Sequence, residues 1–133
     1  MQINVLGGPT LDLSTDEGSI LFHVLKEVVQ ASYIIDADQV ITDARTLVDK
    51  VRAIRKAERM QSTASPQSLT VQADAFLKTL SAATTTLRHL GKPEFETRTG
   101  LSASNAEELV RRLTLLMTPD SGTSEPGSGA EGL

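Results

Sequence analysis

The chain has 133 residues and a formal net charge of −4, with 39% hydrophobic, 23% charged and only 3% aromatic residues. This length predicts one domain with a core of aliphatic side chains. The absence of cysteine excludes disulfides, cysteine-ligated metal centres and thiol catalysis, and the net acidity argues against a protein that coats nucleic acid.

The first predicted element is a β-hairpin over residues 2–13. Apolar and polar side chains alternate in two short runs, and Gly7, Gly8 and Pro9 between them have the composition of a turn. The apolar members of the two runs are Ile3, Val5, Leu11 and Leu13. Two strands alone are marginally stable, so we expect the hairpin to pack on the helices that follow.

A capping box opens the first predicted helix. Ser14 and Glu17 have the spacing at which the serine oxygen accepts a backbone N–H and the glutamate reaches back to the cap. Apolar side chains then recur on one side of a helix over about residues 16–35. Residues near its end, including Ile34 and Ile35, are β-branched and lower helix propensity. An extended end is therefore the alternative, but we predict helix throughout.

The next two predicted helices each carry an apolar seam with spacings of three and four residues. They cover about 38–60 and 69–90, and a polar segment at 61–68 between them has the composition of a loop. The first seam lasts only about two heptads, which favours packing in a bundle, as an αα-hairpin, over a free coiled coil. The predicted interface residues come from these seams: Val40, Ala44, Leu47, Val51, Ile54, Phe76, Leu80 and Leu87.

The C-terminal part begins with a polar connector at 94–100, whose one apolar anchor is Phe95 and which is either irregular or a short strand. Ser104 and Glu107 have the spacing of a second capping box, which predicts a helix over 104–117. The residues beyond it are rich in Pro, Gly, Ser and acidic side chains and have too few apolar groups to offset the entropy of ordering.

Together these elements predict a mostly α fold: a small helical bundle of about four helices over residues 1–118, with an N-terminal β-hairpin and a disordered C-terminal tail over 119–133. The most apolar stretch contains charged side chains, so we expect no membrane span. Glycine and proline interrupt the N-terminal apolar run, so we expect no secretory signal and a cytoplasmic protein.

A search for catalytic and metal-binding motifs yields no candidate. His23 and His89 are far apart in sequence and belong to no zinc-binding pattern. Phosphate-binding loops and serine-nucleophile motifs are also absent from the sequence. The sequence therefore predicts no catalytic residue, no cofactor and no metal. An enzyme whose site is assembled from scattered residues is the alternative.

Charge is distributed unevenly along the chain. Residues 1–43 hold seven acids and one base, whereas residues 44–59 hold six bases and two acids. A basic stripe along the second helix consists of Arg45, Arg52, Arg55, Lys56 and Arg59. Its structural interpretation is a solvated helix face, and its functional interpretation is a docking surface for an acidic partner, a phosphate or nucleic acid.

With no chemistry visible, the leading hypothesis is a non-enzymatic interaction or assembly protein. An adaptor, a chaperone and a small component of a larger particle such as a phage or secretion apparatus all belong to this class. Two helices are long for their neighbours and leave seam surface unmatched, so the expected partner is a second copy in a homo-oligomer. The alternative is a nucleic-acid accessory factor that uses the basic stripe, although the stripe lacks interleaved aromatic residues.

Overall fold

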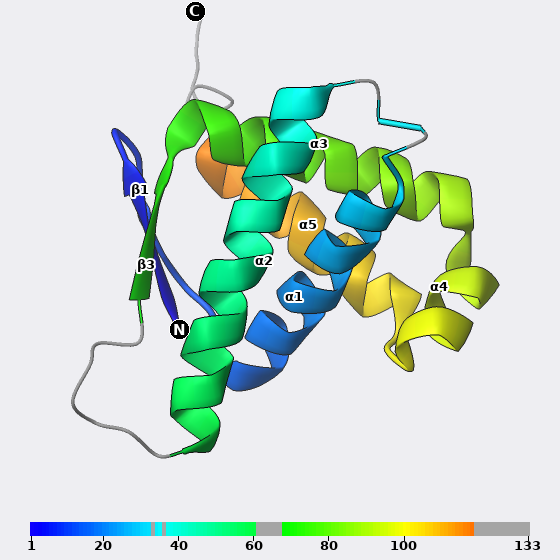
Figure 1. Ribbon diagram of the computed structural model, residues 1–133, viewed down its shortest axis with the longest axis horizontal. Helices are drawn as coiled ribbons and strands as arrows, with labels where there is room; N and C mark the ends of the chain where they lie inside the picture. The colour runs from blue at the N-terminus through cyan, green and yellow to red at the C-terminus, as the bar shows by residue number, and fades with distance from the viewer. Residues whose placement is uncertain (33, 36, 61–67, 119–133) are drawn as a thin grey trace, which may run out of the picture.

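The computed structural model describes residues 1–32, 34–35, 37–60 and 68–118, and it confirms a mostly α fold in which a small sheet covers one side of a helical bundle (Figure 1). The elements in chain order are β1 (Gln2–Leu6), β2 (Thr10–Asp12), α1 (Thr15–Gln30), α2 (Asp38–Arg59), β3 (Ser68–Gln72), α3 (Ala73–Leu90), α4 (Lys92–Thr99) and α5 (Ala103–Met117). The described residues thus form five helices and three strands, one more of each than predicted. The predicted tail at 119–133 lies outside the described residues.

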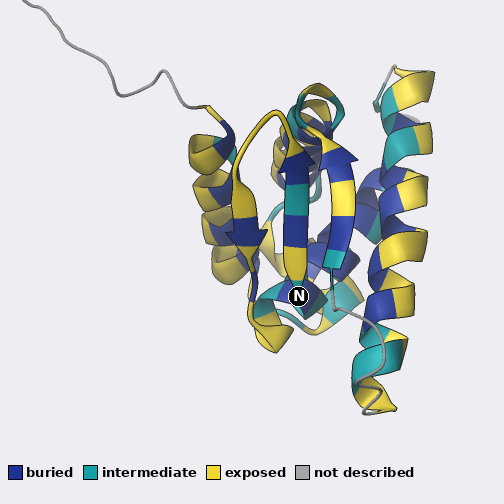
Figure 2. Cartoon of the chain, turned by 90° about the vertical axis from the view of Figure 1, so that its left-hand side faces the viewer, coloured by how far each residue is buried: buried dark blue, intermediate teal, exposed yellow. Residues whose placement is uncertain are grey.

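The predicted hairpin is present, but it belongs to a larger sheet with the strand order β2-β1-β3. β1 pairs with β2 in antiparallel orientation, with Ile3 opposite Leu11, and with β3 in parallel orientation, with Val5 beside Val71. Buried residues alternate with exposed or half-buried ones along β1 and β3 (Figure 2). One face of the sheet therefore packs on the helices, and the other faces solvent.

The capping box at the start of α1 forms as predicted. The Ser14 hydroxyl accepts from the Glu17 amide at 3.1 Å, and the Glu17 carboxylate accepts from the Ser14 amide at 2.9 Å. α1 packs against α2, α3 and α5, which makes it the central helix of the bundle (Figure 1). Its buried apolar residues join one continuous core with side chains from the sheet and all four other helices.

The prediction that the first helix continues to residue 35 is wrong. α1 ends at Gln30, and the Ala31 carbonyl accepts from the amides of Ile34 and Ile35 in a turn. Two causes fit the sequence: β-branched residues crowd the preceding turn of a helix, and the last turn of α1 has no basic side chain to interact favourably with the helix dipole.

The second predicted helix is confirmed to within one residue, as α2, whereas the third begins four residues later than predicted. Leu69 and Val71 are buried, whereas Thr70 and Gln72, which alternate with them, are exposed. This period of two is that of a strand, and β1 supplies the pairing edge that the segment needs. Except for Ser68, the predicted loop at 61–68 lies outside the described residues.

The segment predicted as an irregular connector or short strand at 94–100 is a helix, α4. Pro93 stands in its first turn, and Gly100 ends it with a φ of 73°, a conformation that suits glycine. The second predicted capping box is also wrong, because α5 begins at Ala103 and its cap is Ser102, whose hydroxyl accepts from the Asn105 amide at 3.2 Å. The earlier serine is favoured because the Ala103 amide also finds an acceptor, the Glu96 carboxylate at 3.0 Å.

Candidate partner-binding groove

The predicted interface residues lie inside the folded protomer. Val40 is half-buried, and the other seven are buried and belong to the core that α2 and α3 form with the rest of the chain: Ala44, Leu47, Val51, Ile54, Phe76, Leu80 and Leu87. The two helices contact each other, but the more extensive packing joins α1 to α2. The seams therefore close within one chain, and their contact with a second chain stays a prediction.

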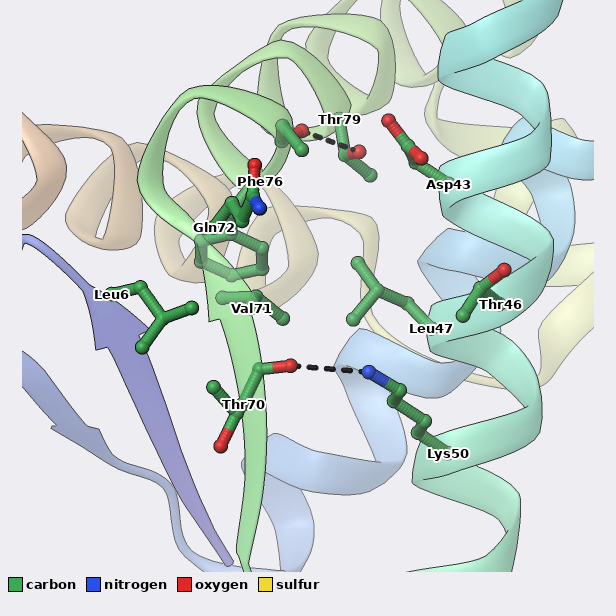
Figure 3. Close-up of a pocket in the computed structure, with 11 residues that line it drawn as sticks. Leu6, Asp43, Thr46, Leu47, Lys50, Thr70, Val71, Gln72, Phe76 and Thr79 are labelled. Atoms are coloured by element: carbon green, nitrogen blue, oxygen red, sulfur yellow. Dashed lines mark hydrogen bonds between the residues drawn. The ribbon is translucent and has the colours of Figure 1, made fainter.

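A groove lies between the edge strand β3 and the facing side of α2, and it encloses a cavity of about 340 Å³ (Figure 3). We call it the edge groove. Its floor is apolar and consists of Leu47, Val71 and Phe76, all of which are buried. Apolar floors with a few polar groups on the rim are typical of binding sites.

The backbone of β3 faces this groove at Thr70. The Thr70 carbonyl oxygen accepts a hydrogen bond from the Lys50 ammonium group at 3.1 Å, across the groove from α2 (Figure 3). β3 is the outermost strand on this side of the sheet, and its bond to Lys50 shows that this carbonyl points away from β1 (Figure 3). Lysine beside an edge strand is a common means of limiting pairing with other chains.

The rim of the edge groove carries two opposite charges on α2. Asp43 and Lys50 are seven residues apart, which is about two helical turns or 10.5 Å along the axis. Asp43 lies at the end of the groove near Thr79, and Lys50 lies at the end near Thr70 (Figure 3). A bound segment would therefore meet a cation and an anion at defined positions.

Leu6 adds an exposed apolar side chain to the same groove. It is the last residue of β1 and is 57% exposed, and it lies beside Val71 and Phe76 (Figure 3). This residue was not predicted from the sequence, although a signal was present. Ile3 and Val5 indicate that the odd-numbered residues of this strand are buried. A leucine at position 6 is therefore an apolar side chain where a polar one is expected.

The basic stripe lies where the sequence placed it, on the outer side of α2. Arg45, Arg52, Lys56 and Arg59 are exposed, and Arg55 is half-buried. The contribution of the neighbouring helix was not predicted from the sequence, because it depends on how α1 packs. That contribution consists of the Phe22 ring, which lies against Arg52 and Arg55, and of Lys26, which lies over the same ring.

The two histidines are not brought into a common site. His23 lies on α1, where its ring packs edge-on against Phe22 with 5.4 Å between centroids, and His89 lies near the end of α3. Within residues 1–32, 34–35, 37–60 and 68–118, no group of three or more His, Asp or Glu side chains is arranged to hold a metal ion.

A polar cluster joins α1 to α4 and has a structural explanation. The Arg98 guanidinium donates to the Glu27 carboxylate at 2.8 Å and to the Gln30 side-chain oxygen at 2.6 Å. Glu27 is buried, so its charge needs such a partner. Both ends of this contact are satisfied, and it fastens α4 to the central helix.

Replacing Arg55 by Gln should raise the pKa of His23. Burial of the ring lowers this pKa below its ordinary value, the charges of Arg55 and Lys26 lower it further, and Glu27 raises it. NMR titration of the ring protons measures the change, and Arg59→Gln is the control that should leave the pKa unaltered. An unchanged or lower pKa in the Arg55 variant would contradict the assignment.

The same pKa has a consequence for stability. His23 is protonated more readily in the unfolded chain than in the folded one, so the free energy of unfolding should fall as the pH drops below about 6.5. Well above that pH the residue is neutral in both states and contributes nothing to the pH dependence. Arg55→Gln should reduce the His23 contribution to the acid-side fall.

Comparisons with protein-family models, with curated proteins and with solved structures found no match for this chain. In the part of the chain that the structure describes, none of the helices combines the length and apolar character that a membrane-spanning helix requires.

Proposed function

We propose that the chain is a non-enzymatic protein-interaction module and that it binds an extended segment of a partner protein in the edge groove. The carbonyl of Thr70 on the outer edge of β3 is the observation that carries this proposal, and the Lys50 ammonium group covers it until a partner strand displaces it. A carbonyl on the outer edge of β3 already accepts a hydrogen bond from across the groove. A backbone N–H of the partner would replace the lysine ammonium group and extend the sheet by one strand.

The lining of the groove indicates which segment fits. Side chains of an added strand point alternately into the groove and away from it. The apolar floor and Leu6 favour an apolar side chain at the inward positions. Once displaced from Thr70, the Lys50 ammonium group remains at the rim and favours a carboxylate on the segment nearby. The expected partner segment is therefore extended, alternately apolar, and acidic at one position.

The test is selection from a phage-displayed library of random peptides on the purified full chain. We expect enriched peptides with alternating apolar residues and an acidic residue. Binding of a labelled selected peptide should weaken by at least about tenfold in Leu6→Asp, equivalent to about 1.4 kcal/mol. Leu116→Asp is the matched control, because that leucine is 50% exposed and lies on α5, away from the groove.

Lys50→Glu is a second variant in the same experiment, and its side chain is exposed, so the fold should tolerate the change. It should remove the preference for an acidic residue and favour a basic one. Absence of enriched peptides, equal losses in the two leucine variants, or an unchanged preference with Lys50→Glu would each overturn the proposal.

Molar mass in solution, from light scattering over a range of concentrations, tests the expected homo-oligomer. A dimer that Leu6→Asp dissociates would assign the edge groove to a second copy of the chain, in place of the partner proposed above. A monomer at every concentration leaves the groove open to the partner segment. An adaptor or chaperone role fits binding of extended segments, while a place in a larger particle and a cytoplasmic location stay predictions. No specific observation among the described residues favours the enzyme alternative.

A further inference from the structure

A second surface, separate from the edge groove, gathers six cations from two helices. We call it the basic face, and it consists of Lys26, Arg45, Arg52, Arg55, Lys56 and Arg59. Its members on α2 run from Arg45 to Arg59, which is about 21 Å along a helix axis. Lys50, which points into the edge groove, is two residues from Arg52 and therefore about 200° around the helix from it. The two surfaces thus lie on different sides of α2.

The basic face contains a hollow between α1 and α2. The hollow has a volume of about 250 Å³, and its lining includes Lys26 from one helix and Arg45 and Arg52 from the other. One carboxylate also lines it, Asp49, which pairs with the Arg52 guanidinium at 3.3 Å. Three cations against one anion leave the hollow with a net positive charge.

The Phe22 ring holds part of this charge in place. The Arg55 guanidinium lies 4.7 Å from the ring centroid, the Arg52 guanidinium 5.6 Å and the Lys26 ammonium group 5.4 Å. The negative face of an aromatic ring attracts such cations, which lowers the entropy that they lose when an anion binds. The lowered pKa of His23, to which Arg55 and Lys26 both contribute, is a second sign of positive potential here.

The chemistry of the basic face favours phosphates over a protein partner. Protein interfaces usually have an apolar centre. Of the large exposed apolar side chains, Leu6, Leu115 and Leu116 lie on elements outside the basic face. Met60 lies at the end of the face, after Arg59, and not at its centre. Phe22 is itself buried beneath the cations, so it offers no surface for base stacking. Arginine forks match phosphate oxygens well, and a row of cations matches a chain of repeating charges.

We infer that the basic face binds the phosphodiester backbone of nucleic acid without sequence preference. The net charge of −4 belongs to the whole chain, whereas binding depends on the local charge of this face. If the basic face neutralises about five phosphates of a single strand, a plot of the logarithm of the affinity against the logarithm of the salt concentration should have a slope of about −3.5. The affinity then falls about 100-fold between about 50 and 200 mM salt.

The experiment is fluorescence anisotropy of the full chain with a labelled single-stranded oligothymidylate, and with a labelled duplex of unrelated sequence. The test variant combines Arg45→Gln, Lys56→Gln and Arg59→Gln, three exposed side chains of the basic face. The control variant combines Lys78→Gln, Lys92→Gln and Arg111→Gln, which are exposed elsewhere and remove the same charge. We expect at least a tenfold loss of affinity in the test variant and a smaller loss in the control.

The salt dependence separates this inference from a general charge effect. The slope for the single strand should become less steep by about 2 in the test variant, because three phosphate contacts are lost. Equal losses in the two variants, or no binding at low salt, would overturn the inference. So would tighter binding of labelled polyglutamate than of either oligonucleotide, because that result would assign the basic face to an acidic protein.

Discussion

Changing Val51 to Asp should abolish the folded state instead of separating two folded protomers. Val51 is 0% exposed and belongs to the continuous core. An unpaired carboxylate at this position costs several kcal/mol even when it is protonated, and far more when it is ionised. The total stability of a small domain is only about 5–15 kcal/mol. Loss of the helical circular dichroism signal at neutral pH is the expected result.

Ala53→Asp is the matched control, since residue 53 lies on the same helix and is exposed. It should retain the helical signal and a cooperative unfolding transition. If Val51→Asp were instead a folded monomer, obtained from a wild-type dimer, the buried position would be contradicted. The seam would then form the interface between chains that the sequence predicts.

The heptad seams show that local periodicity predicts a buried helix side but not the surface that covers it. A spacing of three and four residues indicates a helix with one buried side, and α2 matches that prediction closely. The periodicity does not indicate whether the covering surface belongs to the same chain. Here the covering surface is the buried side of α1, which packs on α2. The residues of the seams carry no information about α1.

Two elements were missed because their stability is not local. β3 is five residues long and pairs with β1, from which it is separated by both α1 and α2, so its strand character depends on a distant edge. α4 has eight residues and a single buried one, Phe95, which gives it no repeating pattern. Both segments follow from tertiary contacts that override weak local preferences.

The two candidate surfaces also differ in how much of each could be predicted from the sequence. The basic stripe was predictable because its charges are spaced along one helix. Its partners Phe22 and Lys26 were not, since they depend on the angle at which α1 crosses the stripe. The edge groove needs four elements together, β1, α2, β3 and α3, and its distinguishing contact joins residues 20 positions apart, Lys50 and Thr70. Only the unexpected parity of Leu6 was visible beforehand.

Replacing Phe95 by Ala should lower the free energy of unfolding by about 3–5 kcal/mol. The side chain is 0% exposed, and it is the only buried residue of α4, which packs on α3 and α5. An eight-residue helix is too short to be stable alone, so the ring is its main attachment. Arg98 lies on the same helix and pairs with Glu27 at 2.8 Å, so loosening α4 also weakens the partner of a buried carboxylate.

Urea unfolding followed by circular dichroism measures this effect, with Thr97→Ala as the control. Residue 97 is exposed on the same helix, and its change should stay within about 0.5 kcal/mol of the wild type. The slope of the unfolding free energy against urea concentration should be comparable for the two variants, which would show that both unfold from the same folded state. A loss below about 1 kcal/mol for Phe95→Ala would mean that the site collapses around the smaller side chain. In that case the Arg98 contact, and not the ring, would hold α4 against the central helix.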